Sequence, residues 1–102
     1  MEDPGTLAEF GLAPGKYIVT VSRMVPEKRH LDLIQAFLDA KLEGWKLALV
    51  GDLSANDAYI RQVSDAAAQS DDVVLTGFQS GDSLAPLYAN AGLFVLPSTH
   101  EG

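Results

Sequence analysis

Cysteine is absent from this chain of 102 residues, so the sequence offers no disulfide framework, no thiolate nucleophile and no thiolate metal ligand. No apolar run approaches the roughly 20 residues that a membrane-spanning helix needs, and the N-terminus has no signal-peptide pattern. We therefore expect a cytoplasmic protein. Positive charge is scarce as well, since seven Lys and Arg residues face fourteen Asp and Glu residues and the formal net charge is −7. This balance argues against general binding to nucleic acid or to an anionic membrane, but it does not exclude a local cationic site.

Glycine-rich phosphate-binding motifs are also missing. A dinucleotide site needs Gly-x-Gly-x-x-Gly after the first strand, and the turn at that place reads Ser-Arg-Met-Val-Pro-Glu, without any glycine. There is no Walker motif and no readable Ser-His-Asp arrangement. His100 next to Glu101 is a poor metal site without further ligands. We therefore predict no bound metal, and any phosphate must be held by side chains rather than by a backbone nest.

Apolar strand-like runs alternate with helical patterns along the chain. Four runs read as strands: 17–21, 46–50, 72–76 and 93–96. The first lacks clean polar alternation, which is typical of a strand buried on both faces of a parallel sheet. Three segments carry apolar residues at helical spacing: 30–42, 56–69 and a segment that begins at Ser80 or Gly81. We expect Gly44 to follow the end of the first helix, and Ser54 or Asn56 to cap the second.

This order predicts an α/β fold, with parallel strands joined by right-handed helical crossovers. We expect a Rossmann-like open parallel sheet of four strands in the order 3-2-1-4, with helices on both faces. Residues 1–15 are expected to be a loop-like linker or lead-in, and residues 16–102 to be the domain itself. In such a sheet ligands bind at the carboxyl edge of the strands, here in the crevice between strands one and four. The loops 22–28 and 97–102 meet there.

Arg23 and Lys28 lie on the loop that joins the first strand to the first helix. With Arg29 they make up three of the seven Lys and Arg residues of the chain. The planar fork of an arginine and the compact charge of a lysine both suit phosphate oxygens, and the start of a helix adds positive potential. The alternative is a solvated loop with ordinary surface charges, and the pattern alone slightly favours that alternative. His30 is expected to be a capping or surface residue.

Other candidate residues follow the later strands. Gly51 and Asp52 close the second strand, and we count Gly51 among the substrate-contacting residues. An acid at the place of Asp52 is typical of ribose binding in dinucleotide enzymes, but without the glycines the signal is weak and a plain turn is the alternative. Gly77 would let a flat aromatic ligand approach the backbone closely. Phe78 could stack on that ligand, or it could belong to the core. The carboxylate of Glu101 could bind sugar hydroxyls.

Six short motifs follow one another along residues 16–102: Val-Ser-Arg-Met-Val-Pro-Glu-Lys (21–28), Leu-Ile-x-Ala-Phe, Leu-Val-Gly-Asp, Val-Val-Leu-Thr-Gly-Phe, Leu-Tyr-x-x-Ala and Pro-Ser-Thr-His-Glu-Gly (97–102). In this order and spacing they resemble the C-terminal, donor-binding domain of the family 4, or group 1, glycosyltransferases. Each motif alone is loose, and their combination carries the resemblance.

The resemblance implies the GT-B architecture, in which an N-terminal domain binds the acceptor and a C-terminal domain binds a nucleoside-diphosphate sugar. It implies sugar transfer with retention of anomeric configuration and without a metal or other cofactor. Arg23 and Lys28 would contact the diphosphate and act in catalysis, and Glu101 would contact the transferred sugar. The backbone near Gly77 and Phe78 would lie by the nucleotide base.

The chain stops at Gly102, before a second glutamate that the family carries, so we expect a donor-domain fragment, truncated at its C-terminus and inactive alone. Its expected partners are a nucleoside-diphosphate sugar and an acceptor held by a missing N-terminal domain. We expect the fragment to bind neither nucleic acid nor membrane, whereas the parent can be peripheral at the inner face of a membrane. Polysaccharide or glycolipid biosynthesis is the implied setting. The alternatives are a non-catalytic nucleotide- or phosphosugar-binding α/β domain and a purely structural half-domain.

Overall fold

The computed structural model describes residues 4–55, 57–79 and 81–95. Helices and strands alternate along these residues as the sequence predicts. In chain order the elements are α1 (Pro4–Glu9), β1 (Tyr17–Val21), the short 3-10 helix η1 (Pro26–Lys28), α2 (His30–Ala40), β2 (Lys46–Val50), α3 (Ala58–Ala67), β3 (Val73–Gly77), α4 (Leu84–Ala89) and β4 (Leu93–Phe94).

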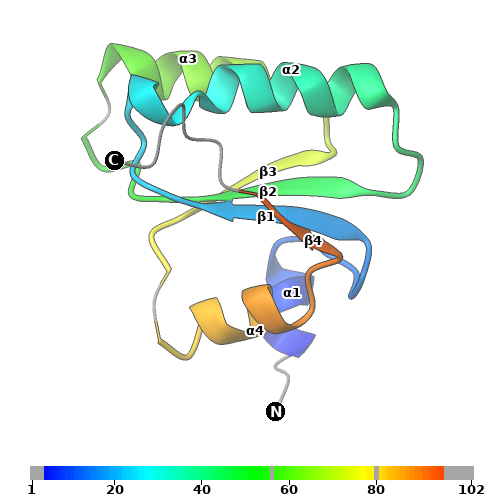
Figure 1. Cartoon of the computed structure of the whole chain (residues 1–102). Coiled ribbons are helices and arrows are strands. Elements are labelled where there is room, and N and C mark those ends of the chain that lie inside the picture. Colours follow the sequence, from blue (N-terminus) through cyan, green and yellow to red (C-terminus); the bar gives the residue numbers. More distant parts are fainter. Residues whose placement is uncertain (1–3, 56, 80, 96–102) are drawn as a thin grey trace.

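The four strands form one parallel sheet in the order β3-β2-β1-β4, which confirms the predicted order 3-2-1-4. Strands β1 and β2 pair along their whole length, from Tyr17 opposite Lys46 to Val21 opposite Val50. Because all four strands are parallel, their carboxyl ends lie at one edge of the sheet (Figure 1). The loops that follow the strands are therefore gathered at that edge, where a ligand site is expected.

Helices cover both faces of the sheet, as predicted: α2 and α3 lie on one face, and α1 and α4 lie on the other (Figure 1). Alternate residues of each strand point to opposite faces, so the two faces have separate cores. The core under α2 and α3 contains Ile18, Ile34, Phe37, Leu47, Leu49, Ile60 and Val63. The core on the side of α1 and α4 contains Leu7, Leu12, Tyr17, Val19, Ala48, Val50 and Leu87. Burial on both faces explains why the strands read as continuous apolar runs.

The N-terminal segment corrects one prediction, because residues 4–9 form helix α1 and not a loop. Pro4 is compatible with the first turn of a helix, where its missing N–H is not needed. Leu7 and Leu12 are buried and pack against Leu87 in the second core. Tertiary burial thus stabilises a helix too short to be stable alone. The proposed division between a lead-in at residues 1–15 and a domain at residues 16–102 stays a prediction.

The helix ends also differ from the predictions. Helix α2 stops at Ala40, two residues early, because Lys41 adopts a left-handed conformation. Helix α3 is capped by Asp57, whose carboxylate accepts the Ile60 N–H at 2.9 Å. Ser54 is therefore not the cap, and Asn56 lies outside the described residues. A side-chain oxygen that accepts the N–H three residues later, where the helix itself provides no acceptor, is the ordinary geometry of a helix N-cap.

Smaller shifts occur in the last third of the chain. Strand β3 runs one residue later than predicted and includes Gly77. Helix α4 begins at Leu84, after turn residues that include Gly81, and Ser80 lies outside the described residues. Strand β4 covers Leu93 and Phe94, and Leu96 lies outside the described part of the chain.

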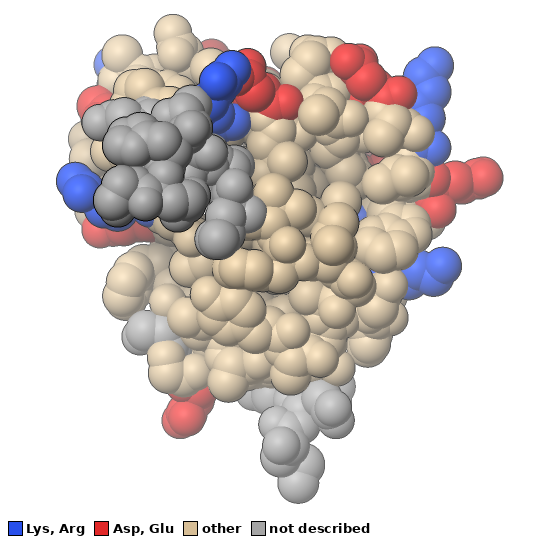
Figure 2. Space-filling model, in the orientation of Figure 1, with Lys and Arg blue, Asp and Glu red and all other residues tan. Residues whose placement is uncertain are grey.

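Charge is distributed unevenly over the surface. In Figure 2 the lower central part of the view, over α4 and β4, is mainly uncharged, and most of the Lys, Arg, Asp and Glu atoms lie over α2 and α3 or at the margins. Tyr88, Leu93 and Phe94, which these two lower elements carry, are exposed. The layer of α2 and α3, where most of the charged atoms lie, also contributes η1 and the start of α3 to the carboxyl edge of the sheet.

Candidate functional site

A cavity of about 430 Å³ opens at the carboxyl edge of the sheet. The ends of β1 and β2 form its base, together with the loop residues that follow them, 21–25 and 50–52 with Ala55. Asp57 and Ile60, at the start of α3, line it as well, and so do Phe78 and Gln79 after β3. Four separate segments thus converge on one cavity, which is the arrangement expected where the loops of a parallel sheet meet.

The loop after β1 is held at several points along its length. The Ser22 N–H donates to the Val50 carbonyl at 3.1 Å, which continues the β1–β2 ladder by one residue. Met24 is buried in the core under α2 and α3. Val25 is extended, as a residue before proline should be, and the turn of η1 follows with the Lys28 N–H donating to the Val25 carbonyl at 3.0 Å. The loop is therefore anchored by backbone and core contacts while Arg23 stays exposed.

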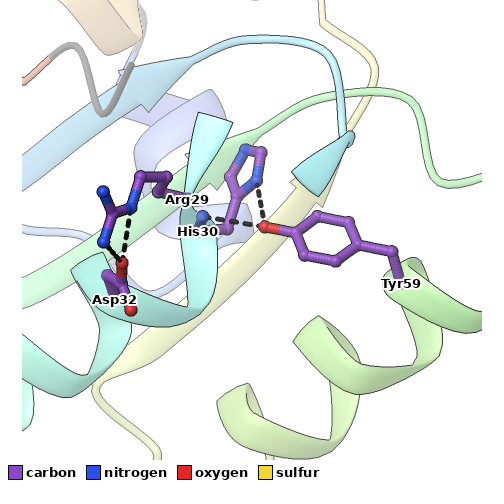
Figure 3. A network of polar contacts seen from close by, with 4 residues as sticks. All are labelled: Arg29, His30, Asp32 and Tyr59. Carbon is purple, nitrogen blue, oxygen red and sulfur yellow. Dashed lines mark hydrogen bonds and ion pairs between the residues drawn. The ribbon is translucent and has the colours of Figure 1, made fainter. Parts of the chain in front are cut away.

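The three clustered cations differ in what surrounds them. Arg29 adopts a left-handed conformation between η1 and α2 and pairs with Asp32 (Figure 3). Arg23 is exposed, lines the cavity, and makes no ion pair with the described part of the chain. Lys28 is half-buried at the end of η1, lies outside the cavity lining, and likewise has no acidic partner among the described residues. As far as the described residues are concerned, two of the three cations thus remain available to an anion.

Gly51 lets the loops after β1 and β2 approach each other closely. A Cβ at Gly51 would lie under 3.0 Å from the Ser22 carbonyl oxygen and at 3.0 Å from the Met24 Cε. Gly51 is buried, and its N–H donates to the Gly77 carbonyl at 3.1 Å. The structure therefore places Gly51 in the cavity lining, where only glycine allows this contact between two backbones.

The residues after β3 lie at the mouth of the cavity. Gly77 has φ of +77°, which turns the chain in a way that favours glycine. Phe78 follows and is 69% exposed, so the alternative that it belongs to the core is wrong. The Gln79 side chain donates to the Thr76 carbonyl at 2.9 Å and fixes this turn. An exposed aromatic ring beside a cavity is a surface on which a flat ligand can stack.

Two carboxylates line the cavity, and both are engaged by backbone N–H groups. The Asp52 carboxylate accepts the Ser54 N–H at 2.9 Å, and this hydrogen bond lowers the pKa of the carboxyl group. Asp57 caps α3 as described above. Asp52 therefore forms the turn that was the plain alternative for it, and it also faces the cavity.

His30 is the residue that the sequence interpretation missed. It is completely buried, so the expectation of a capping or surface residue is wrong. Its Nδ1 lies 3.0 Å from the Tyr59 hydroxyl (Figure 3). On the other side of the ring, its Nε2 lies 2.9 Å from the Ser22 Oγ. Burial, followed by the nearby charge of Lys28, lowers the pKa of His30, so the ring is neutral at neutral pH. Its spacing with Ile34 and Phe37, at i, i+4 and i+7, places it on the buried face of α2 and could have predicted its burial.

The structure thus brings Arg23, Gly51 and Phe78 to one cavity, with Lys28 and Gly77 close by in the sequence. Glu101 and the rest of the loop 97–102 lie outside the described residues. Within the described ranges, no three His, Cys, Asp or Glu side chains form a group that could hold a metal ion. No helix in that part of the chain has the length and apolar character needed to cross a bilayer.

Comparisons with known proteins bear on the fold and the family of the chain. The fold is similar to the crystal structure of a glycosyltransferase from Rickettsia africae ESF-5, with a TM-score of 0.80 and 20% sequence identity over 93% of this chain. The chain spans 26% of the length of that protein. No curated protein matches the sequence. The sequence profile of the family described as "Glycosyl transferases group 1" matches residues 15–102, which is nearly the whole chain. The chain therefore belongs to the group 1 glycosyl transferase family.

Proposed function

We propose that the protein to which this chain belongs is a retaining glycosyltransferase that moves a sugar from a nucleoside-diphosphate sugar to an acceptor. In this proposal the chain forms part of the donor-binding site. The observation that carries the proposal is the position of Arg23, a cation with no acidic partner in the described part of the chain, at the rim of a cavity that also presents the exposed ring of Phe78.

The distribution of charge supports a ligand with one neutral end and one anionic end. The cavity is lined by one cation, Arg23, and by two carboxylates, Asp52 and Asp57. A diphosphate placed among these carboxylates would be repelled, whereas the base and ribose of a nucleoside carry N–H and O–H donors that carboxylates accept. The anionic end fits better on the side of Arg23 and Lys28. A nucleoside in the cavity with its phosphates toward η1 satisfies both conditions.

The same cations have a chemical use in the transfer. Negative charge develops on the diphosphate as the bond to the sugar breaks, and fixed cations aimed at that charge stabilise the transition state. Two cations on an anchored loop can supply this stabilisation without a bound metal, which is our proposal for the cofactor requirement. Retention of configuration and the contact of Glu101 with the transferred sugar rest on the family resemblance.

The remaining parts of the proposal concern the parent protein. We propose the GT-B arrangement, in which a second domain binds the acceptor, and a role in polysaccharide or glycolipid biosynthesis. We also propose a cytoplasmic protein, peripheral at the inner face of a membrane through the other domain. Because the acceptor site in this proposal belongs to a second domain, we expect no turnover by this chain alone.

Titration with separate parts of the donor tests the proposal. UDP, GDP and ADP, their nucleosides and inorganic pyrophosphate are titrated into the chain at low ionic strength, with amide NMR as the readout. Arg23→Ala should weaken the best diphosphate about tenfold, the low end of a charge-assisted hydrogen bond because Arg23 is exposed, and should leave the matching nucleoside unchanged.

Arg29→Ala is the matched control, because Arg29 is an exposed arginine on the same segment that is already paired with Asp32. Its affinity for the diphosphate should stay within about twofold of the unmodified chain, in keeping with a surface ion pair that contributes little. Equal loss of diphosphate affinity in both variants would show a general charge effect and would reject a specific phosphate contact by Arg23.

A further inference from the structure

We propose that Tyr59 and His30 are positioning residues, which act through Ser22 to hold the loop 22–25 in the conformation that presents Arg23 to the cavity. The nature of the ligand rests on the proposed function above. The positioning itself does not, because the hydrogen-bonded chain is present without a ligand.

Three different elements contribute to this chain of contacts. Ser22 follows β1, His30 is the first residue of α2, and Tyr59 is the second residue of α3. His30 lies between the other two and is completely buried. The Tyr59 hydroxyl accepts the backbone N–H of His30 at 2.8 Å and lies 3.0 Å from the His30 Nδ1 (Figure 3). The His30 Nε2 lies 2.9 Å from the Ser22 Oγ.

The hydrogen bonds from Tyr59 through His30 to Ser22 have one direction in which each hydroxyl and the ring N–H donate to an acceptor. Because the Tyr59 oxygen already accepts the His30 N–H, its own O–H is free to donate to Nδ1. The ring proton is then on Nε2 and is donated to the Ser22 Oγ. The Ser22 O–H in turn donates to the Arg23 carbonyl at 3.3 Å. The opposite tautomer would leave the Tyr59 O–H without an acceptor in this chain.

The end of the chain is the backbone of Arg23, which is the reason for assigning a positioning role. The Arg23 carbonyl also accepts the Val25 N–H at 3.0 Å, so the loop is closed around it. The Arg23 side chain is exposed and has no ion pair with the described residues, so the backbone of this loop determines where it begins. The network is part-buried around the His30 ring and exposed at its Ser22–Arg23 end. Paired hydrogen bonds at a buried ring specify one arrangement more strictly than apolar packing would.

The chain also connects two walls of the cavity. The loop 22–25 forms one wall, and Asp57 and Ile60, on either side of Tyr59 in the sequence, line another. Met24 from the first wall and Ile60 from the second also belong to one apolar core. Tyr59 and His30 therefore set how the phosphate-facing loop stands relative to the start of α3.

The first test needs no ligand. Tyr59→Phe keeps the ring and removes the hydroxyl, and Tyr88→Phe is the matched control, because Tyr88 is exposed on α4 at the opposite face of the sheet. Imidazole nitrogen NMR of Tyr59→Phe should show loss of the single Nε2–H form of His30, and the amide signals of residues 22–24 should move. Tyr88→Phe should change neither. Unchanged His30 and loop signals in Tyr59→Phe would overturn the proposal.

A rescue experiment separates positioning from simple packing. The amide nitrogen of Gln can take the place of the His30 Nε2 and donate to Ser22, whereas Ala cannot. His30→Gln should therefore keep the loop signals close to those of the unmodified chain, and His30→Ala should shift them. Equal shifts in both variants would show that ring volume, and not the hydrogen bond, positions the loop.

The ligand stage uses the best nucleoside diphosphate from the titration above, well below the unfolding temperature of each variant. Tyr59→Phe should weaken it about fivefold, as expected for loss of one hydrogen bond, and leave the nucleoside unchanged. Wild-type affinity in Tyr59→Phe would overturn the role in ligand binding. If the unmodified chain binds no nucleotide while the loop signals still respond, the proposed function fails and the positioning of the loop is supported.

Discussion

Substitution of Gly51 is the sharpest perturbation of the candidate site, because it adds one methyl group between two loops. Gly51→Ala places a Cβ under 3.0 Å from the Ser22 carbonyl oxygen, with the Met24 Cε and Cγ at 3.0 and 3.2 Å. The Met24 side chain is flexible and can yield by a rotation. The Ser22 oxygen belongs to the backbone of the loop that carries Arg23, so relief of the contact must move that loop.

The expected cost follows from these contacts. Overpacking of a buried position costs about 1–3 kcal/mol. The lower entropy of an unfolded chain with alanine in place of glycine offsets roughly 0.4–1 kcal/mol of that. A net loss of about 1–2 kcal/mol in the free energy of unfolding should remain. In a domain of about 100 residues each kcal/mol lowers Tm by roughly 4–8 °C.

Gly44→Ala is the matched control. Gly44 has φ of +81°, and a Cβ there would meet nothing within 4 Å, in a turn between α2 and β2 that is remote from the cavity. The left-handed conformation costs alanine about 1–2 kcal/mol, and the same unfolded-state entropy offsets part of that cost, so Gly44→Ala should also lose stability, by no more than Gly51→Ala. Only Gly51→Ala should shift the amide signals of residues 22–24 and weaken a bound diphosphate.

Thermal unfolding and amide NMR of both variants complete the experiment. Unchanged Tm and unchanged loop signals in Gly51→Ala would refute the reasoning that this glycine is required for close approach of the two loops. A loop shift of the same size in Gly44→Ala would assign the effect to general loss of stability and not to the contact with Ser22.

Two further predictions concern stability. Asp57→Ala should lower the free energy of unfolding in urea by about 1 kcal/mol, because α3 loses its cap. Asp57→Asn should retain most of the wild-type stability, because the amide oxygen of Asn also accepts the N–H, whereas an ion pair would be lost. For His30, burial holds the folded pKa below the unfolded value of 6.5, so the unfolded chain takes up the proton first as pH falls. The contribution of neutral His30 to the free energy of unfolding is fully present above pH 6.5. Between pH 6.5 and the folded pKa it falls by at most about 1.4 kcal/mol per pH unit, and His30→Gln should remove this pH dependence.

The strand order could be predicted from the sequence because few arrangements were open to it. Four apolar runs separated by helices require parallel pairing, and right-handed crossovers leave a short list of orders. The rule that ligands bind at the carboxyl edge of such a sheet likewise predicts the position of the loop that carries Arg23. Prediction therefore succeeded where the pattern of a whole element, and not the contact of one side chain, decides the outcome.

Side-chain contacts between elements were harder to predict. His30 is buried because the Tyr59 hydroxyl, 29 residues away, pairs with both its backbone and its ring. The apolar residues of α2, which begin at Leu31, predict the buried face of the helix but do not show that Tyr59 pairs with His30. Phe78 follows a strand, which is typical of a core residue, yet the positive φ of Gly77 precedes it and it is exposed. Helix α1 depends on burial of Leu7 against the sheet, and a segment of six residues has too weak a pattern to show this.

The use of charge in this acidic chain argues for one orientation of the ligand. Asp52 and Asp57 face the cavity, but each is engaged by a backbone N–H, and Arg29 is engaged by Asp32. Arg23 and Lys28 are the members of the cation cluster without such a partner in the described part of the chain. Negative charge on a ligand is therefore stabilised on the η1 side and repelled from the aspartate side. A nucleoside diphosphate that binds with its phosphates toward Asp52 would contradict this electrostatic argument. In that orientation Asp52→Asn would raise its affinity by removing a repulsion, whereas in the proposed orientation Arg23→Ala should lower the affinity and Asp52→Asn should not raise it.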